Sequence, residues 1–338
     1  MQFINNLRGI AILLIVFTHA ISAVPQPGDI GSFLDYVFGS GTVIFMFISG
    51  YLFSSTLDGF DYLPYLKNKF LSVVLPYLII TCPAVLMYAL ALKTSHAWID
   101  MDWFVNDLNP FERYVFMTVT GAALGPLWFI PMVILYFIAA PAFKAVARSN
   151  LLIPLLLATL VAAIMIGRPD NNNNPFQSFV FYLPPYLLGI AAHVHIGSIM
   201  RLKPASLLLL LGYLALYAIS YFVVYTETFR PDSTITMVLY LPLVIIMTAF
   251  CAHYLDKRNV WIDMFARLSF FIFFIHGYFS GMERMTLRRL GFVEAIENPG
   301  LEIVVIVATF LMIIVMSLSA YIVLKFMLRD KSRHLIGG

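Results

Sequence analysis

The chain has 338 residues, of which 61% are hydrophobic and only 12% are charged, and its mean hydropathy is +0.88. A soluble domain typically carries about 25% charged residues, so this composition excludes an ordinary soluble protein and predicts one that crosses a membrane repeatedly. The formal net charge of +3 is small, and the basic residues are scattered over short loops, which excludes a nucleic-acid-binding surface.

Apolar stretches long enough to cross a membrane recur along the whole chain. A helix needs about 20 mostly apolar residues to cross the hydrocarbon core. We therefore predict an all-α integral membrane protein, a bundle of about ten transmembrane helices. In chain order the predicted spans are 8–24, 38–54, 70–92, 115–143, 151–167, 177–195, 205–225, 235–254, 267–283 and 301–327. Residues 1–338 are expected to form a single membrane domain with no appended soluble domain.

The distribution of Lys and Arg predicts that both termini are cytoplasmic. With the N-terminus inside, 14 of the 21 basic residues fall on the cytoplasmic side and 7 on the outer side. Cytoplasmic loops carry such an excess, and an even number of helices returns the C-terminus to the inside, where Lys325 to Arg333 form a basic end. The N-terminal stretch is predicted to be the first spanning helix, because no small-residue cleavage site follows it cleanly.

Two histidines lie inside predicted spans, where an ionisable side chain is costly and is therefore a candidate for function. His19 follows Arg8 by 11 residues, which places it on about the same helix face and roughly 16 Å further along the axis. His276 follows Arg267 by nine residues, roughly 14 Å into the ninth span. The two histidines are thus expected at a similar depth, where neutral imidazole can act as a general base. The alternative is that each is a core residue bonded to a neighbouring helix.

Several other polar or aromatic residues are interpreted structurally first. His193 and His195 lie at the inner end of the sixth span, where they can reach interfacial water. Trp128 is expected in an aromatic belt near the outer face. Pro184 and Pro185 interrupt the sixth span, and such a break indicates backbone that is covered by protein or lines a cavity.

The remaining reactive or charged side chains give weaker indications. Cys82 and Cys251 lie in apolar segments as packing residues, so neither a disulfide nor a metal site is expected. Arg284, Arg288 and Arg289 are placed in the outer loop after the ninth span. The last two are candidates for binding an acidic sugar or a lipid phosphate, although a solvated loop helix is the more common role of such residues.

Four stretches, in chain order, resemble the acyltransferase-3 family of bacterial membrane acyltransferases. The most specific is Leu7-Arg8-Gly9-Ile10-Ala11 running on to His19, because the family's first helix carries an Arg and a His separated by ten residues. The others are Gly41 to Leu52, which ends in Ser-Gly-Tyr-Leu, then Leu127-Trp128-Phe129-Ile130, and Ser269 to His276. The chain departs from the common family pattern at Val43, often an acid, at Phe273, often Tyr, and ahead of Pro76, where lysines replace arginines.

The resemblance implies an acyl-CoA donor, usually acetyl-CoA, and a glycan or lipid-linked sugar acceptor at a bacterial cytoplasmic (inner) membrane. Arg8, Lys67 and Lys69 would attract the CoA phosphates. His19 would act as general base on a sugar hydroxyl or as a transient acyl carrier, with Arg8, His276 and Ser269 supporting the site. No metal is expected.

The runner-up function is a transporter or flippase for a lipid-linked sugar. Ten helices, a broken sixth span and buried histidines suit it too, but no Asp or Glu falls at mid-membrane in the predicted spans, where proton-coupled carriers usually bury one. A purely structural membrane subunit would explain neither the Arg8/His19 pair nor His276. Membrane lipids are expected to surround the bundle, and the sequence leaves open whether the chain forms a homodimer.

Overall fold

The computed structural model describes residues 1–24, 28–39, 41–224, 233–292, 296 and 298–328, and every regular element within them is helical. The predicted basic end beyond Leu328 lies outside the described residues. The α-helices are α1 (Gln2–Ala23), α2 (Asp29–Phe38), α3 (Gly41–Ser55), α4 (Tyr62–Lys69), α5 (Leu75–Ala89), α6 (Met101–Asn106), α7 (Pro110–Thr120), α8 (Phe129–Ile138), α9 (Ala140–Ala147), α10 (Leu152–Ile166), α11 (Pro175–Phe181), α12 (Leu183–Val194), α13 (Ile196–Met200), α14 (Ser206–Val224), α15 (Ser233–Tyr254), α16 (Val260–Arg267), α17 (Ser269–Arg289) and α18 (Pro299–Leu328). The short turns are η1 (Leu57–Gly59), η2 (Phe70–Val74), η3 (Gly125–Trp128), η4 (Asp170–Asn172) and η5 (Lys203–Ala205).

Among the described residues, six helical segments are long and apolar enough to cross a membrane, or up to eight if two bent pairs each count as one span. Two further apolar helices, α10 and α12, are shorter and coincide with the predicted fifth and sixth spans. The chain is therefore an all-helical, multi-pass membrane protein. The number of ten spans and the cytoplasmic placement of the termini stay predictions.

The predicted fourth span, 115–143, is wrong as a continuous helix. The chain forms α7, the turn η3 and α8, with a bend of 75° between the α7 segment and the segment that begins at Gly125. Gly121 ends α7 in the left-handed conformation (φ 70°), which glycine adopts without strain, and Pro126 then opens η3. The predicted ninth span is longer than expected, because α17 continues to Arg289 after a 74° bend from α16.

The predicted break in the sixth span is present. α11 ends at Phe181 and α12 begins at Leu183, with Pro184 and Pro185 in the first turn of the new helix. Proline is tolerated there because the first N–H groups of a helix have no intrahelical partner. Both prolines are buried, so protein covers the break as expected.

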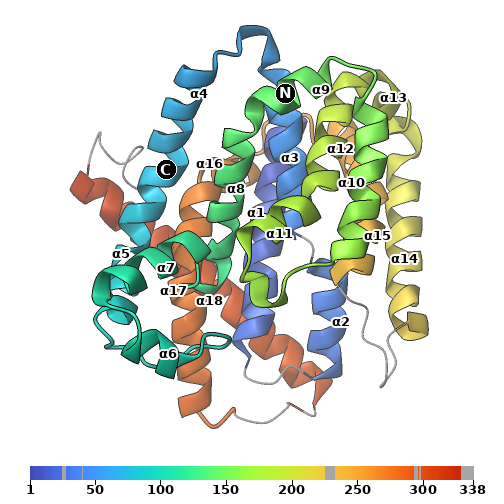
Figure 1. Ribbon diagram of the computed structural model, residues 1–338. Helices are drawn as coiled ribbons and strands as arrows, with labels where there is room; N and C mark the ends of the chain where they lie inside the picture. The colour runs from blue at the N-terminus through green and yellow to red at the C-terminus, as the bar shows by residue number, and fades with distance from the viewer. Residues whose placement is uncertain (25–27, 40, 225–232, 293–295, 297, 329–338) are drawn as a thin grey trace.

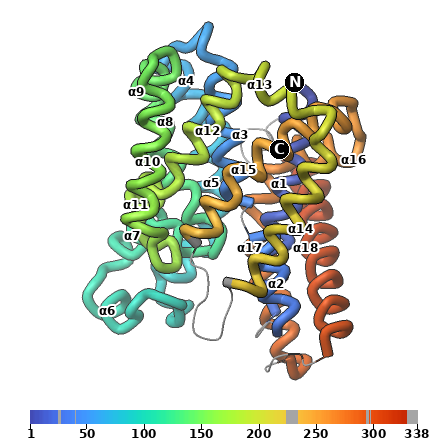
Figure 2. Tube along the Cα trace, turned by 90° about the vertical axis from the view of Figure 1, so that its right-hand side faces the viewer, coloured from blue at the N-terminus to red at the C-terminus, as the bar shows by residue number. Residues whose placement is uncertain are grey.

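α1 runs through the middle of the bundle, where it packs against α2, α3, α15, α16, α17 and α18 (Figures 1 and 2). The close approach of α16 depends on Gly9, because a Cβ there would lie 2.5 Å from the carbonyl oxygen of Ile262. Hydrogen bonds also join the start of α1 to α16 and the segment before it. Asn5 Nδ2 donates to Asp263 Oδ1 (2.8 Å), and Asn6 Nδ2 donates to the Lys257 carbonyl (3.1 Å). These contacts fix the first turns of α1, which carry Arg8.

α3 and α12 cross with their backbones in direct contact. A Cβ on Gly50 would lie 1.9 Å from the carbonyl oxygen of Tyr186, and one on Gly189 would lie 2.0 Å from that of Phe47. Since real side-chain carbons never approach this closely, only glycine fits either position. Gly50 belongs to the second of the four family-like stretches. The close crossing of α3 and α12 explains why this stretch carries a glycine at that position.

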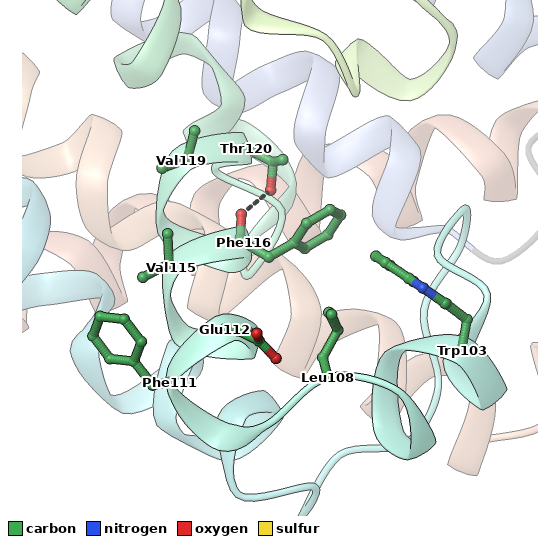
Figure 3. Close-up of a pocket in the computed structure, with 8 residues that line it drawn as sticks. All are labelled: Trp103, Leu108, Phe111, Glu112, Val115, Phe116, Val119 and Thr120. Atoms are coloured by element: carbon green, nitrogen blue, oxygen red, sulfur yellow. Dashed lines mark hydrogen bonds between the residues drawn. The ribbon is translucent and has the colours of Figure 1, made fainter.

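A groove of about 400 Å³ lies between α6 and α7, at the end of the molecule opposite the N-terminus (Figures 1 and 3). Phe111, Val115 and Val119 follow one another along α7, while the ring of Phe116 points toward Trp103 of α6, 5.7 Å away between ring centroids. Seven of its eight lining residues are uncharged, and the eighth, Glu112, has one carboxylate oxygen bound by the Asn109 N–H (2.8 Å). The groove is thus an apolar surface without reactive groups.

Candidate active site

The two histidines from opposite ends of the chain meet in the bundle. The rings of His19 on α1 and His276 on α17 lie 5.0 Å apart between centroids and are tilted by 53°. The prediction that they share one depth is therefore confirmed. His276 is fully buried, whereas His19 is half-buried, so His19 is the ring that a substrate can reach more easily.

The hydrogen bond of His276 fixes which of its nitrogens carries the proton. Nδ1 lies 2.9 Å from the carbonyl oxygen of Ile272, and because a carbonyl only accepts, Nδ1 is the donor. In the neutral ring, Nε2 is then left as an acceptor. Nε2 is buried, and no described residue hydrogen-bonds to it. A buried acceptor without a partner next to His19 is an unusual arrangement for a purely structural histidine.

Ser269 begins α17 two helical turns before His276, on the same face. Its Oγ is buried, and within the described residues it has neither a hydrogen-bond partner nor a recorded contact with the two histidines. Two turns correspond to roughly 10 Å along the helix. The structure thus places Ser269 beneath the histidine pair rather than against it, and its supporting role stays a prediction.

The third family-like stretch packs against α17 beside His276. A Cβ on Gly277 would lie 3.0 Å from Pro126 Cδ, so this glycine lets η3 approach the helix next to the histidine. The ring of Phe273 bridges the two elements, 5.4 Å from Phe129 and 5.9 Å from His276 between centroids. The segment that opens α8 therefore forms one wall of the histidine site.

The prediction that Trp128 belongs to an aromatic belt is wrong. Its side chain is only 8% exposed and stacks on Tyr182, with ring centroids 5.7 Å apart. Trp128 belongs to the η3 turn, which places its ring inside the bundle. Trp128 instead packs η3, which lies beside His276, against Tyr182 at the break between α11 and α12.

Two of the three cations predicted to bind the donor come together near the start of α1. Arg8 Nη2 donates to Asn5 Oδ1 (3.2 Å), while its buried Nε has no partner among the described residues. Lys69 Nζ lies 5.4 Å from the ring centre of Tyr65, and its positive charge is repelled by that of Arg8. A π-helical turn, η2, follows Lys69 directly, and such turns are frequent at functional sites.

No carboxylate neutralises this pair within the described residues. The charge of Asp263 attracts Arg8, but its oxygens bind Arg267 (2.9 Å) and Arg258 (3.4 Å). Unbalanced cations with a free donor suit an anionic ligand such as a phosphate. Lys67, the third predicted cation, is exposed on α4 and makes no described contact with the other two.

Arg8 and His19 stand on one unbroken helix, so their separation of roughly 16 Å along the axis is retained. A phosphate held at Arg8 would leave room for an extended arm to reach His19. The other predicted histidine with described contacts, His193, bonds through Nδ1 to Ser54 Oγ (2.9 Å) on α3 and contacts neither His19 nor His276. His193 is therefore bonded to a neighbouring helix and lies outside the histidine site.

Two arginines near His19 were not predicted as residues of the site. The positive charges of Arg168, in the loop after α10, and of Arg284, on α17, both act on the His19 ring. The expectation that Arg284, Arg288 and Arg289 lie in a loop is wrong, because all three belong to α17. Only the arrangement of the helices in space brings the charges of these arginines close to the histidine, so no local pattern would have identified them.

Comparison with known proteins agrees with this geometry. No curated protein and no solved structure is significantly similar to the chain. The model of the acyltransferase-3 family, described as an acyltransferase domain, matches residues 1–322, which include all four family-like stretches and both histidines. The match therefore extends over nearly the whole chain. The protein belongs to the acyltransferase-3 family and is a membrane acyltransferase by that membership.

Proposed function

We propose that the protein transfers a short acyl group, most simply acetyl, from acyl-CoA to a hydroxyl of a glycan or lipid-linked sugar at the bacterial inner membrane. The observation that carries the proposal is the contact between His19 and His276 in the middle of the bundle. An accessible histidine backed by a buried one provides a base beside the apolar rings of Phe129 and Phe273.

In this reaction His19 takes the proton of the acceptor hydroxyl as its oxygen attacks the thioester carbonyl. The carbon–oxygen bond forms, the carbon–sulfur bond breaks, and the CoA thiolate receives the proton back from His19. The products are the O-acyl sugar and CoA thiol. His276 supports this step because its Nε2, an acceptor without a partner, can take an N–H of His19 and leave the other nitrogen of that ring as the base.

Acyl transfer from labelled acetyl-CoA is the direct test. Membranes that contain the protein and a candidate glycan are expected to place label on the glycan or on a lipid-linked sugar, and membranes without the protein are not. Label found only as free acetate, or no transfer with acetyl-CoA, succinyl-CoA or another short acyl-CoA, would contradict the proposal. Comparing the transfer rates with these acyl-CoA donors, one at a time, identifies the acyl group.

Substitution of Arg8 by glutamine is expected to raise the KM for acetyl-CoA by about 10- to 100-fold. The reason is that a charge-assisted hydrogen bond to a phosphate contributes about 1.5–3 kcal/mol, and Arg8 has a free, buried Nε to offer. The measurement is transfer rate against donor concentration. Lys257→Gln is the matched control, because Lys257 is an exposed cation beside the start of α1. Equal donor KM values in both variants would remove Arg8 from the donor site.

A further inference from the structure

Arg284 reaches back across the histidine site from α17 to α1. It lies two turns beyond His276, and its Nη2 donates to the carbonyl oxygen of Ser22, three residues beyond His19. On both helices it is therefore on the side of the histidines away from Arg8. The side chain is exposed, and its other guanidinium nitrogens have no described partner.

Arg168 is held over the opposite wall of the site. Its guanidinium carbon lies 5.4 Å from the ring centre of Trp128, and its Nε donates to Asn172 Oδ1 (2.6 Å). The cation–π contact with Trp128 and the hydrogen bond to Asn172 orient the side chain. The two terminal nitrogens of Arg168 have no partner among the described residues. The N–H groups that normally bind a carboxylate or phosphate are therefore free.

Neither arginine is neutralised by an ion pair in the part of the chain that the structure describes. The ion pairs found there involve Arg148, Arg258 and Arg267. The exposed carboxylate of Asp35 acts on Arg168 from α2 but forms no ion pair with it. Two guanidinium charges thus act on one half-buried histidine, and no carboxylate among the described residues forms an ion pair with either, an arrangement that favours an incoming anion.

We propose that Arg168 and Arg284 together bind an anionic group of the acceptor, a carboxylate or a phosphate, and so orient the neighbouring hydroxyl toward His19. This inference rests on the proposed acyl transfer and adds the class of acceptor, an acidic sugar or a sugar phosphate. It is distinct from the donor site, because Arg8 lies roughly 16 Å along α1 on the other side of His19.

The test is competition by three sugars that differ in charge: glucuronate, glucose 1-phosphate and uncharged methyl glucoside. Each is added to the transfer reaction with saturating acetyl-CoA, which keeps the donor site occupied. In the native protein at least one charged sugar is expected to inhibit at about tenfold lower concentration than methyl glucoside, competitively with the glycan. Stronger inhibition by glucuronate would identify a carboxylate as the bound group, and stronger inhibition by glucose 1-phosphate would identify a phosphate.

Arg168→Gln and Arg284→Gln are each expected to remove this preference for charged sugars and to raise the acceptor KM, with the donor KM unchanged. Arg201→Gln is the matched control, because Arg201 is an exposed arginine directly after α13 with no described contact to either histidine. A merely structural role would change protein amount or kcat without changing the order of the three inhibitors. Equal inhibition by charged and neutral sugars in the native protein, or an unchanged preference in both variants, overturns the inference.

A binding measurement separates this inference from the proposed activity. The thermal stability of the purified protein, with CoA present, is expected to rise with the charged sugar and not with methyl glucoside. If no acyl transfer is found but this rise occurs and disappears in both glutamine variants, the anion site stands and the proposed function fails. If transfer occurs without any charge preference in inhibition or stability, the proposed function stands and the anion site fails.

Discussion

Replacement of His19 by alanine is expected to lower kcat for acyl transfer by about 10²- to 10⁴-fold, the usual contribution of a positioned general base. His19 is the accessible member of the histidine pair, and His276 is buried behind it with its Nδ1 committed to Ile272. Because His276 is fully buried, the acceptor hydroxyl cannot reach its Nε2, and His276 cannot replace His19 as the base. The measurement is the initial rate with saturating labelled acetyl-CoA and glycan, normalised to the amount of protein in the membrane.

The matched control is His193→Ala. His193 is also a half-buried histidine in the bundle, but it bonds to Ser54 rather than to the site. Its loss is expected to lower stability slightly while leaving kcat within a fewfold of the native value. A His19→Ala protein that keeps near-native kcat would remove His19 from the centre of the reaction. Equal losses in both variants would indicate damage to the bundle rather than to the chemistry.

The second large effect concerns folding. Gly50→Val is expected to remove most of the folded protein from the membrane, because its Cβ would lie 1.9 Å from the carbonyl oxygen of Tyr186. That atom belongs to the backbone, so relief requires α3 and α12 to move apart and to lose their shared packing. Overpacking typically costs about 1–3 kcal/mol, and a clash between backbones lies at or above the top of that range. Protein amount and the midpoint of thermal unfolding in detergent measure the effect.

Gly212→Val gives the comparison for this change. Gly212 lies within the apolar helix α14, and a Cβ there would have open space within 4 Å. The substitution is expected to leave protein amount and unfolding midpoint close to native. If Gly50→Val behaved like Gly212→Val, the backbone contact of α3 with α12 would not be needed for the fold. Gly189→Val, the reciprocal position, is expected to resemble Gly50→Val because its Cβ would lie 2.0 Å from Phe47 oxygen.

The histidine site illustrates how much of a membrane enzyme can be predicted from its sequence. The axial rise of a helix is fixed, so counting from Arg8 and Arg267 gave the depths of His19 and His276 before any packing was known. The same reasoning could not predict whether the two helices are neighbours. The cost of placing a charge in lipid marks candidate residues, but it does not say which helices face one another.

The errors lie where the chain stops being a regular helix. Gly125 to Trp128 are apolar and read as part of a long span, yet Gly121 and Pro126 produce a bend of 75° that turns Trp128 inward. Hydropathy reports average composition over about 20 residues, so a turn of four apolar residues does not register in it. Apolar character thus identifies segments that can cross a membrane but does not report the direction of the backbone within them.

The sequence by itself determined the membrane class, the helical character, the family-like stretches and the similar depth of the two histidines. These follow from local composition and from the constant geometry of a helix. Only the tertiary structure decided that His19 touches His276, that η3 walls the site, and that Arg168 and Arg284 act on the same ring. Those relations join residues more than a hundred positions apart, and they depend on close helix crossings such as that at Gly9, where one missing side chain sets which backbones can meet.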